Sequence, residues 1–125
     1  MTEIELATVI IGCAIKVHKA LGPGLFEEAY KECLFQELIK ANMLAEKEKL
    51  MSLVYEGVKI ENGGKVDLMA ENKVVISVKT VDSITEFHVA QTLTLLRLSG
   101  CKLGLIINFN SLKLKDGIKR VVNNL

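Results

Sequence analysis

The chain contains no tryptophan and a single proline, and aromatic residues make up only 5% of its 125 residues. It also lacks an excess of charge, because 16 Lys and Arg against 15 Asp and Glu leave a net charge of +1. Proteins that bind nucleic acid by bulk electrostatic attraction usually have a strong positive charge, so any such contact here must be local. Half of the residues are hydrophobic, which suffices for one compact domain over residues 1–125.

Long hydrophobic runs are also missing. The longest, near Val9–Ile15, contains a glycine and is far shorter than the ~18 residues of a membrane-spanning helix. The first residues, Met-Thr-Glu-Ile-Glu, are acidic where a secretory signal would be basic. The three cysteines are widely spaced without a CxxC pair, which favours reduced thiols over a zinc site. We therefore expect a cytoplasmic protein with no membrane segment.

The first third of the chain has the pattern of two helices. Helical spacing of apolar residues predicts a helix from Glu3 to Ala20, and its apolar face is wider than a single stripe. Such surplus apolar surface commonly marks an interface, so we expect a homodimer. Leu21-Gly22-Pro23-Gly24 predicts a sharp corner, followed by a second helix over about Leu25–Met43.

The remainder alternates between strand and helix patterns. Four short runs predict an antiparallel meander: Lys49–Tyr55, Val58–Glu61, Lys65–Ala70 and Val74–Thr80. A third helix should begin near Ser83-Ile84-Thr85-Glu86, which has capping-box spacing, and should stop at Gly100. Leu103–Phe109 is apolar on both faces and predicts a buried strand parallel to Val74–Thr80.

These elements predict an α/β fold with a mixed central sheet flanked by helices. The expected order is α-α-β-β-β-β-α-β, with a short last helix in Gly117–Asn124. Metal-dependent hydrolysis of a phosphodiester needs carboxylates for Mg²⁺ or Mn²⁺ and a cation near the developing charge. The candidates for that chemistry are Glu27, Asp67, Lys79 and Gln91.

The register of one hairpin decides whether these groups can converge. If Glu71-Asn72-Lys73 is a three-residue loop, Asp67 lies opposite Ser77 and Lys65 lies opposite Lys79, all on one face. A two-residue loop would place Asp67 and Lys79 on opposite faces. The sequence permits either register.

Several ordered segments share one resemblance. Gly24-Leu25-Phe26-Glu27-Glu28-Ala29-Tyr30 has the form GxxExxY, and Val66-Asp67-Leu68, Val78-Lys79, His88-Val89-Ala90-Gln91 and Leu103–Phe109 follow in order. The chain resembles the GxxExxY proteins of the PD-(D/E)XK nuclease-like superfamily, which implies a restriction-endonuclease-like fold. The resemblance further implies that Asp67 binds metal, Lys79 is the lysine of the (D/E)xK element, Glu27 is a helix-borne acid and Gln91 lines the site.

Two positions depart from the family pattern. Ser77 stands where Asp or Glu is expected two residues before Lys79, and Leu95 stands where a tyrosine is usual. A hydroxyl is a poor substitute for a carboxylate ligand, so Glu27, Asp67 and Ser77 should bind Mg²⁺ or Mn²⁺ only weakly. We therefore predict a nuclease-like protein with impaired activity; the alternative is an inactive module that binds nucleic acid or protein.

Each candidate also has a purely structural interpretation. Asp67 and Lys79 could form an ion pair without any metal. Glu27 could simply complement a helix dipole, Gln91 could lie at the surface, and Tyr30 could be a core aromatic with a bonded hydroxyl.

Overall fold

A computed structural model describes all 125 residues. Two helices lead the chain, a five-stranded sheet follows, and a third helix crosses between two of its strands. The elements are α1 (Glu3–Leu21), α2 (Glu27–Lys40), β1 (Ala45–Tyr55), β2 (Val58–Ala70), β3 (Val74–Lys79), α3 (Glu86–Ser99), β4 (Leu103–Asn108), a 3₁₀ turn η1 (Leu114–Gly117) and β5 (Ile118–Val122). This is the predicted α/β class, a mixed sheet flanked by helices.

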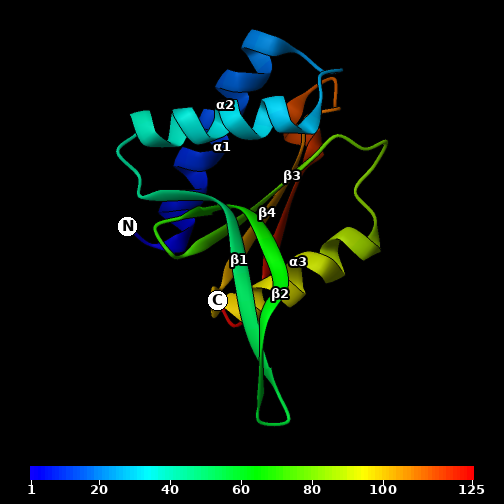
Figure 1. Cartoon of the computed structure of the whole chain (residues 1–125). Coiled ribbons are helices and arrows are strands. Elements are labelled where there is room, and N and C mark those ends of the chain that lie inside the picture. The colour runs from blue at the N-terminus through cyan, green and yellow to red at the C-terminus, as the bar shows by residue number, and fades with distance from the viewer.

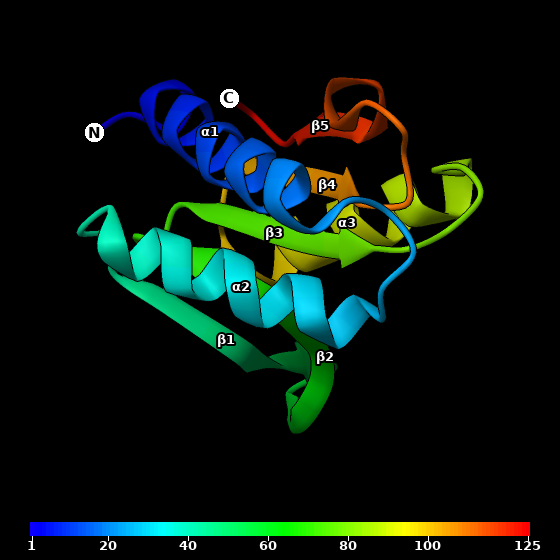
Figure 2. The same cartoon turned by 90° about the horizontal axis from the view of Figure 1, so that it is seen from above.

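The sheet has the strand order β1-β2-β3-β4-β5. Only β3 and β4 are parallel, as the predicted crossover through α3 requires. Helices α1 and α2 cover one face and α3 covers the other (Figure 2). The larger core lies under α1 and α2 and the smaller one under α3, so β3 and β4 are buried on both faces.

The corner between α1 and α2 is built by glycines and one tyrosine. Gly22 and Gly24 have φ angles of 70° and 103°, which residues with a Cβ rarely adopt. The Tyr30 hydroxyl donates to the Gly22 carbonyl and accepts from the Leu25 N–H at 3.1 Å. Its ring stacks on Phe109 with the centroids 4.6 Å apart. Tyr30 is thus a core aromatic that fixes the start of α2.

The second and third predicted strands form one continuous strand, β2. Sequence patterning separated them at Asn62-Gly63-Gly64, but the strand runs through this segment, which forms an irregularity where the pairing shifts from Leu53–Ile60 to Met51–Gly64. A Cβ at Gly63 would come within 2.5 Å of the Leu53 side chain, so the glycines serve close strand packing instead of a turn. The real turn is Glu56-Gly57, with both φ angles positive, and the hairpin tip extends beyond the rest of the molecule (Figure 1).

The C-terminal prediction of a short helix is wrong. Residues Leu114–Gly117 form a 3₁₀ turn, and Ile118–Val122 form β5, antiparallel to β4. Strand β4 would otherwise expose an unpaired edge, and pairing with the β-branched segment Ile118–Val122 satisfies its backbone. The segment was too short for its sequence pattern to reveal this.

Helix α1 is covered more fully than its wide apolar face suggested. Val9, Ile11 and Ile15 pack partly against the larger core, and the apolar side chains left most exposed on this helix are Ile4 and Leu21 near its ends.

No helix of the structure combines the length and apolar character that crossing a membrane requires.

Candidate active site

Asp67 lies at the point where β2 separates from β3. The β2–β3 ladder runs from Ala70 and Val74 to Leu68 and Ile76, which is the register of the three-residue loop. Beyond the end of this ladder, a side chain replaces the backbone carbonyl as hydrogen-bond acceptor: Asp67 Oδ2 accepts the Val78 N–H at 2.9 Å. The ladder continues neither to the expected pairing of Asp67 with Ser77 nor to that of Lys65 with Lys79, so the four residues do not share the predicted face. Asp67 therefore contacts the segment that contains the (D/E)xK positions.

Ser77 turns toward α3 on the other side of that segment. Its hydroxyl lies 3.3 Å from the hydroxyl of Thr92, and both side chains are buried, with 6% and 1% of their surface exposed. Thr92 is in turn held close to the sheet, where its Cγ2 would be only 2.7 Å from a Cβ at Gly104. At the position expected to hold an acid, the structure thus has a neutral, buried hydroxyl that contacts the hydroxyl of Thr92.

The other predicted residues are less closely gathered. Lys79 is half-buried at the end of β3 and forms no ion pair. Glu27 begins α2 without a hydrogen bond or ion pair of its own. Gln91 is exposed on α3 and lines a hollow of about 320 Å³ with Lys65 of β2 and Leu95. Asp67 hydrogen-bonds the Ser77–Lys79 segment. The side chains of Glu27 and Gln91 form no hydrogen bond or ion pair with Asp67 or with that segment.

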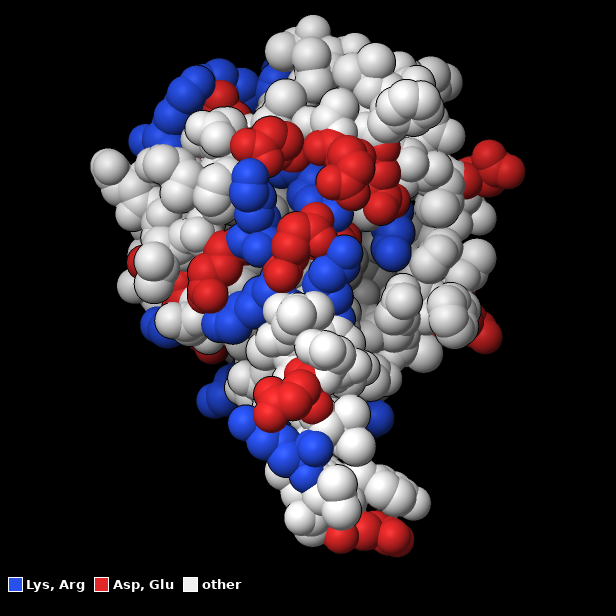
Figure 3. All heavy atoms as spheres, viewed as in Figure 1, with Lys and Arg blue, Asp and Glu red and all other residues white.

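The ion-pair partner of Asp67 is Lys31 of α2, and the alternative pair with Lys79 is not formed. Lys31 Nζ lies 3.6 Å from Asp67 Oδ1, 2.9 Å from Glu28 Oε1 and 2.6 Å from Glu48 Oε1. Only 5% of the Lys31 side chain is exposed, against 18% for Asp67. Lysine and carboxylate side chains are densely intermingled over α2, β1 and β2 (Figure 3).

An irregularity in β1 brings Glu48 into this cluster. The register of β1 with β2 places Glu48 opposite Asp67, and Glu48 has a φ angle of 55°. Successive strand residues normally point to opposite faces. Here consecutive residues of β1 both reach α2, because Lys47 pairs with Glu32 at 2.6 Å and Glu48 pairs with Lys31. The left-handed backbone at Glu48 thus directs a third carboxylate, beside those of Asp67 and Glu28, at the buried lysine.

The charges in this cluster reinforce one another. Burial alone would lower the pKa of Lys31, but hydrogen bonds to Glu48 and Glu28 and the charge of Asp67 raise it above its ordinary value. The hydrogen bond from Lys31, followed by that from Lys65, lowers the pKa of Glu48. Lys65 Nζ lies 2.6 Å from Glu48 Oε2. Lys31 and Glu48 therefore remain charged at neutral pH.

Sequence reasoning missed Lys31, although one signal was present. Lys31, Leu34 and Leu38 lie three and four residues apart, so the lysine falls on the buried stripe of α2. A lysine on an apolar stripe requires charged partners, which the pattern alone does not name. Glu48 gave no comparable signal, because its inward direction depends on a backbone angle.

These residues do not fit a divalent-metal site as they stand. No group of three or more His, Cys, Asp or Glu side chains is arranged to hold a metal ion. Asp67 already uses one oxygen for the Val78 N–H and the other for Lys31, and Ser77 offers only a neutral oxygen that Thr92 contacts. Hard cations of this class prefer several carboxylate or carbonyl oxygens.

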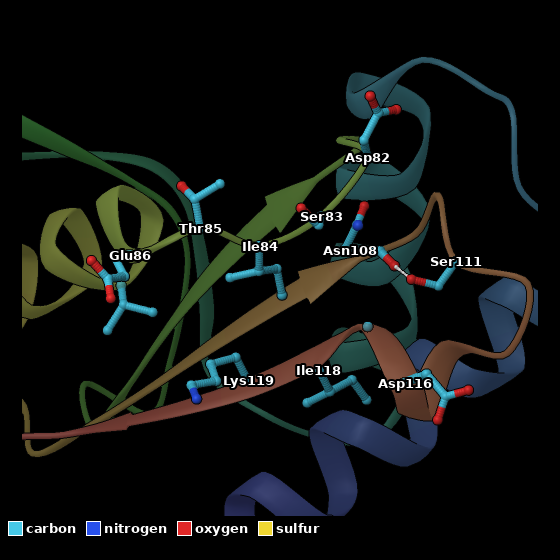
Figure 4. A pocket seen from close by; sticks show the side chains of 12 residues that line it. Asp82, Ser83, Ile84, Thr85, Glu86, Asn108, Ser111, Asp116, Ile118 and Lys119 are labelled. Atoms are coloured by element: carbon cyan, nitrogen blue, oxygen red, sulfur yellow. Dashed lines mark hydrogen bonds between the residues drawn. The ribbon is translucent and has the colours of Figure 1, made fainter.

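The largest hollow, of about 560 Å³, lies beyond the carboxyl ends of β3 and β4 (Figure 4). Asn108 anchors its wall: its Oδ1 accepts from the Val81 N–H at 3.1 Å and its Nδ2 donates to the Val81 carbonyl at 2.9 Å. Asp82, Glu86 and Asp116 line this hollow with a single basic residue, Lys119. Its net negative charge disfavours an anionic phosphodiester.

A family match agrees with the fold. A sequence model of the PD-(D/E)XK nuclease superfamily matches residues 4–121, nearly the whole chain. No curated protein and no solved structure is a significant match. The matched span includes α2, the segment from Ser77 to Lys79, and all of α1 and of the sheet except Glu3 and Val122. The chain therefore belongs to the PD-(D/E)XK nuclease superfamily.

Proposed function

We propose that this protein is a GxxExxY-type member of the superfamily whose metal-dependent phosphodiesterase activity is impaired, so that it cleaves DNA or RNA slowly or not at all. One observation supports this most strongly. Ser77, at the expected carboxylate position, is a buried neutral side chain engaged with Thr92. Asp67 is the carboxylate that hydrogen-bonds the Ser77–Lys79 segment, through the Val78 N–H.

The chemistry explains the expected loss. A bound Mg²⁺ or Mn²⁺ supplies Lewis acidity to the phosphodiester and to the attacking water. Losing even an outer-shell partner typically costs ~10–100-fold in metal affinity or activity, so losing a ligand costs at least that. Lys79 has no ion-pair partner, which leaves its ammonium available to a phosphate oxygen. Phosphodiester binding can therefore persist where metal binding is weak.

Calorimetric titration of Mn²⁺ tests the proposal. Ser77→Glu should strengthen binding at least ~10-fold, because it restores the carboxylate expected two residues before Lys79, and Asp67 already accepts a hydrogen bond from Val78 between these two positions. Asp67→Ala in that background should remove the gain, since two ligands of one ion act as a unit.

Ser52→Glu is the matched control. Ser52 is exposed on β1, so this substitution adds the same charge away from Asp67. Its affinity should equal that of the wild type. Tight Mn²⁺ binding by the wild-type protein, or no gain from Ser77→Glu, would contradict an impaired site at position 77.

The second candidate function is an inactive module that binds a nucleic acid or protein partner. The observation that favours it is the projecting β1–β2 hairpin (Figure 1). Val54, Tyr55 and Val58 near its tip are 71%, 65% and 59% exposed. Exposed apolar side chains gathered in one place commonly mark an interaction surface. Metal-independent nucleic-acid binding with no cleavage after Ser77→Glu would favour this function.

A cytoplasmic homodimer completes the proposal. All three cysteines are free, and exposed apolar side chains remain at Ile4, Leu21 and the hairpin tip. Light scattering at high concentration should give twice the mass of the chain. Tyr55→Lys should lower that mass if the hairpin tip forms the interface, whereas Ile4→Lys should do so if α1 forms it.

A further inference from the structure

Lys31 is the one cation in direct ion-pair contact with Asp67. We infer that Lys31 supplies Asp67 with the counter-charge that a divalent cation would otherwise supply, and that it therefore competes with metal for this carboxylate. The inference rests on the proposed function, since both concern the same site. It adds a second cause of weak metal binding that is independent of Ser77.

The geometry makes the competition direct. Asp67 Oδ1 lies 3.6 Å from Lys31 Nζ, and Oδ2 accepts the Val78 N–H at 2.9 Å. Oδ2 thus accepts a backbone hydrogen bond, while Oδ1 faces the Lys31 ammonium in an ion pair. A metal ion that binds Asp67 must weaken one of these contacts, and the backbone N–H is part of the sheet.

Lys31 is also held firmly in place. Its Nζ bonds to Glu28 and Glu48 at 2.9 and 2.6 Å, and its side chain is only 5% exposed. The neighbouring Tyr30 is fully buried, stacks on Phe109 and hydrogen-bonds the corner before α2. Lysines usually extend their ammonium into water, so this arrangement requires its three carboxylates. The same carboxylates raise its pKa and keep it charged.

The size of the effect follows from charge proximity. At 3.6 Å from Asp67, the Lys31 ammonium repels any cation that approaches this carboxylate. Changing the partner of a metal ligand typically alters metal affinity by ~10–100-fold. Removal of the Lys31 charge should therefore tighten metal binding at Asp67 by at least ~10-fold.

The test titrates Mn²⁺ by calorimetry into Lys31→Met and Lys31→Arg, each in the wild type and in Ser77→Glu. Lys31→Met should bind at least ~10-fold more tightly than its parent in both backgrounds. Lys31→Arg keeps the charge and should match its parent. Lys47→Met is the matched control, because Lys47 forms the neighbouring pair of β1 with Glu32 at 2.6 Å without touching Asp67.

The outcomes separate this inference from the proposed function. If Ser77→Glu tightens binding but Lys31→Met does not, the inference fails and the proposed function stands. If Lys31→Met tightens binding but Ser77→Glu does not, the inference stands and the explanation through Ser77 fails. Adding Asp67→Ala to Lys31→Met must abolish the gain; a gain that survives places the ion elsewhere and overturns the inference.

A measurement that keeps Lys31 covers the case in which Lys31→Met does not fold. The side-chain ammonium nitrogen of Lys31 can be followed by NMR while Mg²⁺ is added to the wild type and to Ser77→Glu. Its resonance should move together with the backbone signal of Asp67, while the Lys47 ammonium signal should stay. Movement of the Asp67 signal with an unmoved Lys31 signal would overturn the inference.

Discussion

Asp67 and Ser77 lie next to each other on one hairpin, yet their surroundings are opposite. Asp67 faces a charged cluster in which Lys31 of α2 and Glu48 of β1 meet. Ser77 faces the neutral, buried hydroxyl of Thr92 on α3. Helices pack against both faces of the sheet at the site. The charged side chains of the site gather on the α2 side, whereas Ser77 contacts a neutral side chain on the α3 side. A two-carboxylate site would need charge on both sides.

The α2 side depends on Tyr30, and its loss should have the largest effect. Tyr30→Ala should lower the free energy of unfolding by about 3–5 kcal/mol, because a buried aromatic ring is removed. Its stacking on Phe109 and two hydrogen bonds are lost as well. Urea unfolding measures the change. Tyr55→Ala, at a tyrosine 65% exposed, should change stability far less; equal losses would show that Tyr30 does not anchor α2.

The α3 side depends on close packing at Gly104. Gly104→Ala should destabilise the protein by about 1–3 kcal/mol, because its Cβ would lie 2.7 Å from Thr92 Cγ2. Gly12→Ala is the control: a Cβ there meets no atom within 4 Å, and alanine in a helix is favoured by about 0.5–1 kcal/mol. Denaturant midpoints should therefore move in opposite directions. A stabilising Gly104→Ala would mean that α3 packs loosely at Ser77.

Ser77→Ala isolates the hydroxyl pair itself. It should cost about 1 kcal/mol, since a buried hydrogen bond with Thr92 is lost. As a control, Thr94→Ala removes an exposed hydroxyl from α3, the helix that carries Thr92, and should lower the unfolding free energy less than Ser77→Ala does. A neutral or stabilising Ser77→Ala would indicate that the hydroxyl is kept for a role other than packing.

The charged cluster predicts the smallest change, a difference in acid stability. The pKa of Glu48 is lowered in the folded state, mainly by Lys31 and then by Lys65. Its stabilising contribution is therefore present above its unfolded pKa and is lost as the pH falls through its lower folded pKa. Thermal unfolding between pH 6 and pH 3 should show a steeper loss for the wild type than for Glu48→Gln. If the stability of both proteins fell equally with pH, Glu48 would not interact with Lys31 and Lys65 in the way described.

The fold was largely predictable because local patterns and the global fold agree. The limits of α1 and the parallel crossover through α3 followed from the sequence, whereas the three-residue loop before Val74 was one of two registers that the sequence permitted. The start of α3 was nearly right: its cap is Thr85, and His88 accepts the Thr85 N–H in place of an acid. Strand β5 and the continuity of β2 depend on pairing with neighbours, which residue patterns do not encode.

The candidate site was predictable only along its strands. Asp67 does reach the segment of Ser77 and Lys79, but the predicted common face is wrong, because Asp67 contacts Lys31 of α2 and Ser77 contacts Thr92 of α3. The partner of Asp67 could not be predicted, because Lys31 comes from a helix distant in sequence and Glu48 turns inward through a positive φ. Such contacts depend on tertiary placement, which periodicity does not define.

A nuclease assay tests the central claim most directly. Wild type, Ser77→Glu and Ser77→Glu with Asp67→Ala would be incubated with plasmid DNA, single-stranded DNA or RNA, with Mg²⁺, Mn²⁺ or a chelator. The account predicts slow or no cleavage by the wild type, metal-dependent cleavage by Ser77→Glu on at least one substrate, and loss of that gain with Asp67→Ala. Efficient metal-dependent cleavage by the wild-type protein would contradict it.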